Sequence, residues 1–340
     1  MKTLAAALLL LACDDPAPPP EPPPRDQAIL AVKATIATEL DALADAATAL
    51  RDAAPDHPWS TAERATLRER WGTTRDHYER IEGAVAMLFP NFDHSIDDRY
   101  EGFVERARDA DPFDGEGVTG MHAIERILWA GEHPEPVRAF EARLHLGQPA
   151  RAPATDDEAR AFKAGLLTRL VTDCATMRDQ FRPLALDPAA AYRGVLGSIE
   201  EQLEKVNLGG TGEAESRYAQ RTLADMRENL AGGRAIIDAL APWLEAEAPT
   251  ILPSIRAGFD RLAAAYDAIE GPALPPIPEG WPRRLEPTDE QLATPFGQLY
   301  ATVRHEADPD DPTSLLSAMV QGADALGIAV RPRALPREPR

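Results

Sequence analysis

The sequence predicts an all-α protein whose long helices form two lobes. Apolar residues recur in steps of three and four along most of the 340-residue chain, which is the period of an amphipathic helix. No alternation of apolar and polar residues longer than a few positions indicates a β-strand. The stretch 147–155 is rich in proline and alanine and lacks periodicity, which is typical of a connection between lobes. We therefore expect one helical bundle at 27–147 and a second at 155–330.

The N-terminal residues are expected to lie outside the fold. Lys2 precedes an apolar run that ends in Leu10-Leu11-Ala12-Cys13, which fits a bacterial lipoprotein signal and is too short to span a bilayer. We interpret 1–12 as a signal peptide and Cys13 as the lipidated first residue of the mature chain; a plain secretory signal cut nearby is the alternative. Residues 13–26 are rich in proline and acid, so they predict an extended tether to the membrane.

Helices of the first bundle follow from apolar periodicity and from signals at their ends. Ser60 is a good N-cap, and Glu63 completes a capping box three residues later. Pro90 is expected to stop that helix, and 91–99 to form a polar connection. Helices are expected at 27–50, 60–89, 100–108, 119–130 and 134–145.

The second bundle is predicted in the same way. Asp156 and Asp157 are expected to cap its first helix. The Gly-rich stretch 209–212 predicts a loop, and it lacks the Lys-Ser/Thr sequel of a phosphate-binding loop. The stretch 271–287 contains six prolines and is expected to be a linker on the surface, and 331–340 a disordered tail. Helices are expected at 156–182, 188–206, 213–244, 249–269, 289–306 and 312–326.

The formal charge of −20 argues against nucleic acid as a partner and favours cations. Only Cys174 remains once Cys13 is assigned to the lipid, so no internal disulfide is expected. Apolar neighbours predict that Cys174 is a buried thiol without a functional role.

Two short stretches carry the candidate metal ligands. In Gly120-Met121-His122-Ala123-Ile124-Glu125, the imidazole and the carboxylate lie one turn apart on one helix face. With seven His and 56 Asp and Glu residues, this spacing alone is weak evidence, because roughly one such pair is expected by chance. The stretch Tyr78-Glu79-Arg80-Ile81-Glu82 has the same layout, with Glu82 inside an apolar stripe. A carboxylate in such a stripe must be paired, protonated or bound to a metal, and two facing helices of this kind can form a metal site.

Three stretches together resemble the signature of the imelysin family, and they occur in the order in which that family has them. They are Tyr78-Glu79-Arg80-Ile81-Glu82, Ser95-Ile96-Asp97-Asp98-Arg99, and the decapeptide from Gly120 to Trp129 with the hallmark Gly-x-His-x-x-Glu. The stretch from Tyr218 to Gly232 is similar to one where many members read Ser-x-x-Thr-Leu-x-Asp. The resemblance covers about residues 28–270. The family includes periplasmic iron-uptake proteins of the EfeO and EfeM type and is catalogued among peptidases.

This resemblance implies two packed four-helix bundles with a metal ion bound between helices. Carried over to this chain, it implies Glu79, Glu82, His122 and Glu125 as ligands, with Asp97 as a fifth ligand or an acid beside them. One imidazole and several carboxylates suit iron, zinc or another divalent ion. The expected partners are therefore a metal ion, the membrane through the lipid, and a membrane iron permease or a redox protein.

Three functions stay open at this point. The first is a lipid-anchored protein of the cell envelope that faces the periplasm and binds iron for uptake. The second is a metallopeptidase in which Glu82 or Glu125 activates a metal-bound water, although the sequence has no His-Glu-x-x-His and we assign no catalytic residue. The third is a structural or partner-binding lipoprotein whose acids pair with arginines such as Arg75 and Arg126.

Overall fold

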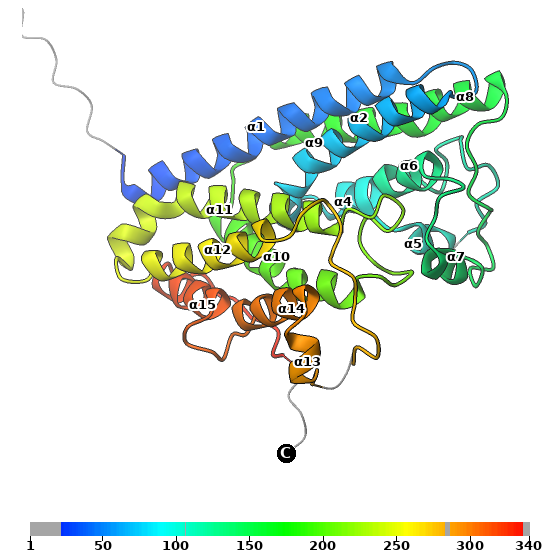
Figure 1. Ribbon diagram of the computed structural model, residues 1–340. Helices are drawn as coiled ribbons and strands as arrows, with labels where there is room; N and C mark the ends of the chain where they lie inside the picture. The colour runs from blue at the N-terminus through cyan, green and yellow to red at the C-terminus, as the bar shows by residue number, and fades with distance from the viewer. Residues whose placement is uncertain (1–21, 106, 283–285, 336–340) are drawn as a thin grey trace, which may run out of the picture.

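The computed structural model describes residues 22–105, 107–282 and 286–335, and within these ranges the chain is helical without a β-strand (Figure 1). The first half contains α1 (Pro24–Ala53), α2 (Thr61–Glu79), α3 (Glu82–Leu88), α4 (Pro90–Asp97), α5 (Tyr100–Val104), α6 (Gly120–Leu128) and α7 (Glu135–Glu141). The second half contains α8 (Asp156–Phe162), the π-helical turn η1 (Lys163–Leu167), α9 (Thr168–Phe181), α10 (Pro188–Leu208), α11 (Thr222–Glu247), α12 (Leu252–Asp267), α13 (Asp289–Leu292), α14 (Pro295–Glu306) and α15 (Leu315–Ala325). The all-α prediction is confirmed.

Helix α11 lies between two groups of long helices and contacts both of them. Helix α1 lies along α2, α9 and α11, and α11 in turn contacts α10 and α12 (Figure 1). Helices α14 and α15 cover α10 and α12 from the other side. Several of these contacts join helices from before and after 147–155, notably α1 with α9 and α3 with α10. The division into bundles at 27–147 and 155–330 therefore stays a prediction.

Among the element boundaries that differ from the sequence prediction, three affect the site. The helix expected over 60–89 is divided, because α2 ends at Glu79 and α3 begins at Glu82. Pro90 begins α4 instead of only ending a helix, which agrees with the preference of proline for the first helical turn. Helix α11 begins at Thr222, so the segment 209–221 is an irregular loop.

The division between α2 and α3 coincides with a close approach of α11. A Cβ atom on Gly232 would overlap the backbone carbonyl of Arg80, so the α11 backbone lies directly against the break. One turn further on, Gly83 and Gly194 allow α3 and α10 to approach in the same way. Side chains at the end of α2 and the start of α3 therefore meet those of α10 and α11.

The predicted signal peptide, Cys13 and the tether as far as residue 21 lie outside the described residues. Residues 24–26, expected in the tether, form the first turn of α1, and 331–335 of the expected tail have no regular structure. Cys174 is buried, and burial raises the pKa of its thiol. In the described part of the chain, no helix has both the length and the apolar character needed to cross a membrane.

Candidate metal centre

The site begins with a glycine that lets α6 start against the end of α4. Gly120 has φ of +84°, and a Cβ atom there would overlap the backbone carbonyl of Ile96. Only glycine combines this backbone angle with such a close contact. The contact places His122, in the first turn of α6, beside Asp97 at the end of α4.

His122 faces two carboxylates that come from other parts of the chain. Its Nε2 atom lies 3.6 Å from Oδ1 of Asp97 and 3.5 Å from Oε1 of Glu215, which belongs to the loop 209–221. One donor atom from each of the three residues lies within 4.8 Å of the others. We call Asp97, His122 and Glu215 the imidazole cluster.

Glu125 fixes the orientation of the imidazole. Its Oε2 atom lies 2.7 Å from Nδ1 of His122, and its Oε1 atom accepts the backbone N–H groups of Tyr218 and Ala219 at 2.9 and 2.7 Å. Because an ionised carboxylate can only accept, Nδ1 carries the proton and Nε2 of the neutral ring carries a lone pair. Nε2 is buried and has no hydrogen-bond partner.

This arrangement favours a cation between the three side chains. A nitrogen lone pair and two carboxylate oxygens repel one another unless a proton or a metal ion lies among them. Burial lowers the pKa of His122, but its contacts with Glu125 and Glu215 outweigh burial, so the pKa is raised. Burial raises the pKa of Glu215, yet Lys205, the neighbouring His122 ring and two arginines bring it well below its usual value. Glu215 therefore stays ionised, and a proton competes with any metal ion at His122.

Arg75 lies behind the imidazole cluster and contacts its carboxylates. The guanidinium donates to Oδ1 of Asp97, to Oε1 of Glu215 at 2.9 Å, and forms an ion pair with Glu79 four residues later. Its side chain is 0% exposed. Burial alone would lower the pKa of Arg75, but Glu79, Asp225 and Glu215 outweigh it and raise the pKa, so the guanidinium is charged.

A second buried cluster lies where α2 and α3 meet α10 and α11. Lys205 Nζ lies 3.3 Å from Oε2 of Glu79, 3.2 Å from Oε2 of Glu82 and 2.9 Å from Oδ1 of Asn229. The Asn229 amide donates to Oε2 of both glutamates, at 2.6 and 2.8 Å. We call Glu79, Glu82, Lys205 and Asn229 the lysine cluster.

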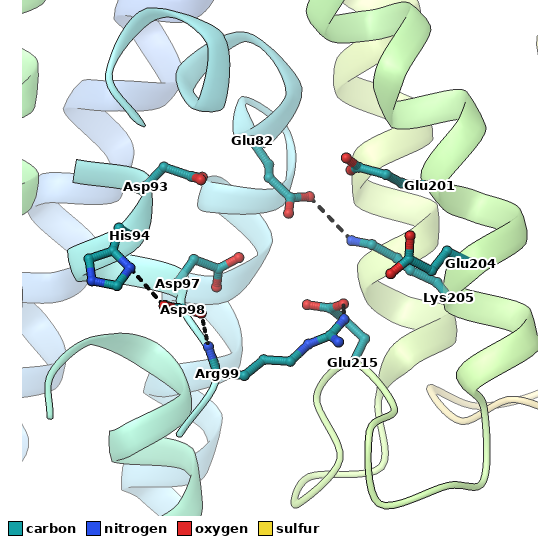
Figure 2. A pocket seen from close by; sticks show the side chains of 10 residues that line it. All are labelled: Glu82, Asp93, His94, Asp97, Asp98, Arg99, Glu201, Glu204, Lys205 and Glu215. Carbon is teal, nitrogen blue, oxygen red and sulfur yellow. Dashed lines mark hydrogen bonds and ion pairs between the residues drawn. The ribbon is translucent and has the colours of Figure 1, made fainter. Parts of the chain in front are cut away.

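A cavity of about 420 Å³ connects the two clusters to the surface. Figure 2 shows its side chains converging from α3 and α4 on one side and from α10 and the loop 209–221 on the other. Two of its acids, Asp97 and Glu215, belong to the imidazole cluster, and Glu82 and Lys205 belong to the lysine cluster. Its further acids are Asp93, Asp98, Glu201 and Glu204. Such a lining attracts cations and disfavours anions.

The structure brings the five sequence-predicted ligands into one neighbourhood but gives them different contacts. Asp97 and His122 share the imidazole cluster. Glu125 contacts the opposite ring nitrogen of His122, so it can orient the imidazole. Glu79 and Glu82 lie in the lysine cluster.

Sequence reasoning missed Glu215 and Lys205. Both lie more than 120 positions from the side chains they contact on α2, so no local spacing could pair them. A signal for Glu215 does exist in the Gly-rich stretch 209–212, which predicts a loop; that loop extends as far as residue 221. Arg75 was expected as a partner of Glu79, and the structure shows that contact.

Comparisons with known proteins agree with this description. The family model described as Imelysin (Peptidase_M75) matches residues 28–325. Proteins described as "Iron uptake system component EfeO" from Escherichia coli K12 and Shigella flexneri are 27% identical over 247 residues, which are 72% of this chain. These residues match 55% of the EfeO length, so the chain spans about half of the curated relatives it matches.

Two crystal structures share the fold. An imelysin-like protein from Psychrobacter arcticum 273-4 aligns with a TM-score of 0.54 and 16% identity, over 90% of this chain and 93% of that protein. A putative iron-regulated protein A precursor from Parabacteroides distasonis aligns with a TM-score of 0.53 and 15% identity, over 92% and 96%. At this identity the likeness concerns the fold. Together with the family match over most of its length, it leads to one assignment: this chain belongs to the imelysin family.

Proposed function

We propose that this protein binds a metal ion, iron in the cell, through Asp97, His122 and Glu215, and that it serves iron uptake. The EfeO relatives are described as components of an iron uptake system, which supports iron as the cargo and a multi-protein pathway as the context. Two carboxylate oxygens and one imidazole nitrogen form a hard donor set without thiolate, which suits iron, zinc and manganese better than Cu(I).

One observation carries the proposal: a buried nitrogen without a partner faces two carboxylates. Nε2 of His122 lacks a hydrogen bond although its side chain is only 3% exposed. Buried polar atoms in native proteins are almost always paired, so an unpaired one needs a reason. A metal ion at this point would bind the lone pair and both facing oxygens at once. In this proposal Glu125 orients the His122 ring and is not a ligand. The lysine cluster stabilises the helices beside the site and does not bind the ion.

The geometry favours binding over peptide hydrolysis. A peptidase of this kind would need Glu82 or Glu125 as the general base that activates water. Both oxygens of Glu125 are engaged by His122 and two backbone N–H groups, and Glu82 is held by Lys205 and Asn229. We therefore expect no chelator-sensitive cleavage of an unfolded protein substrate by the purified chain.

The alternative of a structural lipoprotein has support from Arg75, which already neutralises part of the acidic charge. It predicts a protein that binds no metal ion. Calorimetric titration of the metal-free protein distinguishes this alternative from the metal-binding proposal. The titrants are Fe(II) under anaerobic conditions, Fe(III) as a weak chelate, and Zn(II).

We expect one site in the wild type and at least about 100-fold weaker binding in His122→Ala, because a lost ligand costs several kcal/mol. His94→Ala is the matched control: His94 lines the same cavity, but its Nδ1 lies 2.7 Å from Asp98 and away from the cluster. Its affinity should stay within about twofold of wild type. A wild type that binds none of the ions, or undiminished binding by His122→Ala, would contradict the proposal.

The same proposal assigns the protein to the cell envelope, anchored by a lipid on Cys13 and facing the periplasm. A single acyl anchor and an acidic tether would leave the domain free to meet a membrane iron permease or a redox protein. Metabolic labelling with a radioactive fatty acid tests the anchor. We expect label on the wild type and none on Cys13→Ser, which should fractionate away from membranes.

A further inference from the structure

Arg75 shares its acceptor atoms with the proposed metal site. The two oxygens that accept from its guanidinium, Oδ1 of Asp97 and Oε1 of Glu215, are the same atoms that face Nε2 of His122. Each oxygen has more than one lone pair, so it can accept from Arg75 and still bind an ion. Arg99 differs, because it contacts only the other oxygen of Glu215, Oε2, at 2.9 Å.

Arg75 cannot move aside when an ion enters. Its side chain is fully buried, and besides the two cluster carboxylates it contacts Glu79 and lies 3.8 Å from Asp225. The guanidinium cannot be deprotonated in a protein, so its charge remains next to a bound ion. The ion is therefore repelled by a fixed positive charge a few ångströms away.

The contribution of Arg75 differs between the empty and the loaded site. Without an ion, the guanidinium neutralises Asp97 and Oε1 of Glu215, since Arg99 pairs only with the other oxygen of Glu215. With an ion, the guanidinium keeps these two contacts, and the loaded site differs from the empty one by the repulsion between its charge and that of the ion. The free energy of ion binding is the difference in free energy between the loaded and the empty site. Arg75 therefore lowers the affinity of the site for the ion.

We propose that Arg75 is a built-in counter-cation that keeps the site stable when empty, weakens its hold on the cargo ion, and speeds its release. The inference rests on the proposed function, and it deepens it, because an uptake component must release its ion as well as bind it. Arg75 is thus a positioning residue that sets affinity and is not itself a ligand.

The test compares Arg75→Met with wild type, using Mn(II) and Tb(III) as redox-stable divalent and trivalent probes. We expect Arg75→Met to bind Mn(II) about tenfold more tightly, and Tb(III) about 30-fold more tightly, because repulsion grows with the charge of the ion. Release into excess chelator should slow by similar factors. A purely structural role for Arg75 would not produce a gain that increases with ion charge.

Two controls define the result. Arg80→Met removes the same charge nearby, but Arg80 pairs with Glu228 and Glu39 outside the cluster, so affinity should stay within about twofold. Adding His122→Ala to Arg75→Met should abolish the gain, because the gain must act through the imidazole cluster.

The outcomes separate this inference from the proposed function. If the wild type binds neither ion, the proposed function fails and this inference fails with it. If the wild type binds and a folded Arg75→Met binds no more tightly, only this inference is overturned. Should Arg75→Met not fold, Arg75→Gln decides: its uncharged amide can still donate a hydrogen bond to a cluster carboxylate, so binding should tighten, more for Tb(III) than for Mn(II), and binding equal to or weaker than wild type refutes the counter-cation role.

Discussion

The imidazole cluster and the lysine cluster are built from similar parts yet differ in how those parts are paired. Each contains two carboxylates and one nitrogen base in a buried setting. Lys205 has three acceptors for its three N–H bonds, whereas Nε2 of His122 has no partner. On the function proposed above, the acids alone do not mark the metal site; the unpaired Nε2 atom of His122, which faces two of them, does.

The two clusters also differ in how their charges are balanced. In the lysine cluster, burial raises the pKa of Glu82, but Lys205, Arg75 and the Asn229 hydrogen bond together outweigh it and the net shift is downward. Burial also lowers the pKa of Lys205, and Glu79 and Glu82 raise it well above its usual value. In that cluster each ionised side chain has an oppositely charged partner, and these ion pairs stabilise the contact between α2, α3, α10 and α11. The imidazole cluster is open at one atom, which suits a site that loads and unloads.

The largest effect should come from breaking the lysine cluster. Lys205→Met leaves Glu82 without its cation and Glu79 with Arg75 alone, so the free energy of unfolding should fall by about 3–5 kcal/mol. His122→Ala in the metal-free protein should cost only about 1 kcal/mol, because Glu125 keeps two backbone N–H donors. Urea denaturation followed by circular dichroism measures both. Equal losses would remove the distinction between a structural and a binding cluster.

The next effect concerns metal affinity and uses a matched pair of isosteric changes. Glu215→Gln removes a charge and a ligand oxygen from the imidazole cluster, and should weaken Mn(II) binding by about 100-fold. Glu82→Gln makes the same change in the lysine cluster and should weaken it less than about threefold. If Glu82→Gln loses as much affinity as Glu215→Gln, Glu82 is a ligand as the sequence predicted. The assignment of the site to Asp97, His122 and Glu215 alone would then be wrong.

The parts of this fold that the sequence predicted well are those with strong local periodicity. The helix expected at 27–50 is α1 at 24–53, and the one expected at 119–130 is α6 at 120–128. His122 and Glu125 share a turn as expected, since that relation depends only on helix geometry. Membership of the imelysin family was likewise visible in three short stretches of sequence.

What the sequence could not supply is pairing between distant segments. Glu215 was expected on a helix, because the residues after Gly212 have no strong turn signal of their own. Whether a buried acid binds a metal ion or a lysine depends on what faces it, and Lys205 faces Glu82 from 123 positions away. The sequence thus predicted several of the acids that lie near one another but not Glu215, and tertiary contacts determine what each acid does.

A smaller effect should come from the residue that orients the imidazole. In Glu125→Gln, an uncharged amide replaces the carboxylate that holds the Nδ1 proton, so the ring loses its fixed orientation. Changes to such partners of metal ligands typically cost 10–100-fold, and we expect about tenfold weaker Mn(II) binding. The same titration measures it, and a loss as large as that of His122→Ala would instead make Glu125 a direct ligand.

The smallest effect tests the cavity wall beside the lysine cluster. Burial, followed by the charge of Glu82, raises the pKa of Glu201 to about 7 from a usual value of 4.5. Between these values the folded protein binds more protons than the unfolded chain, so stability falls as pH rises from 4.5 to 7. Glu201→Gln removes this loss. We expect its stability relative to wild type to improve by about 1 kcal/mol across that range, less than the full shift because solvent partly screens the group.

Urea denaturation at several pH values between 4.5 and 7.5 measures this change, and Glu204→Gln is the control. Glu204 lines the same cavity on the same helix but is exposed, so water screens its charge and Glu204→Gln should change the free energy of unfolding by less than about 0.5 kcal/mol. If the free energy of unfolding varies with pH in the same way in wild type and Glu201→Gln, Lys205 already neutralises the charge of Glu201. A rising difference would mean that Lys205, already paired with Glu79 and Glu82, leaves the charge of Glu201 unpaired in this wall.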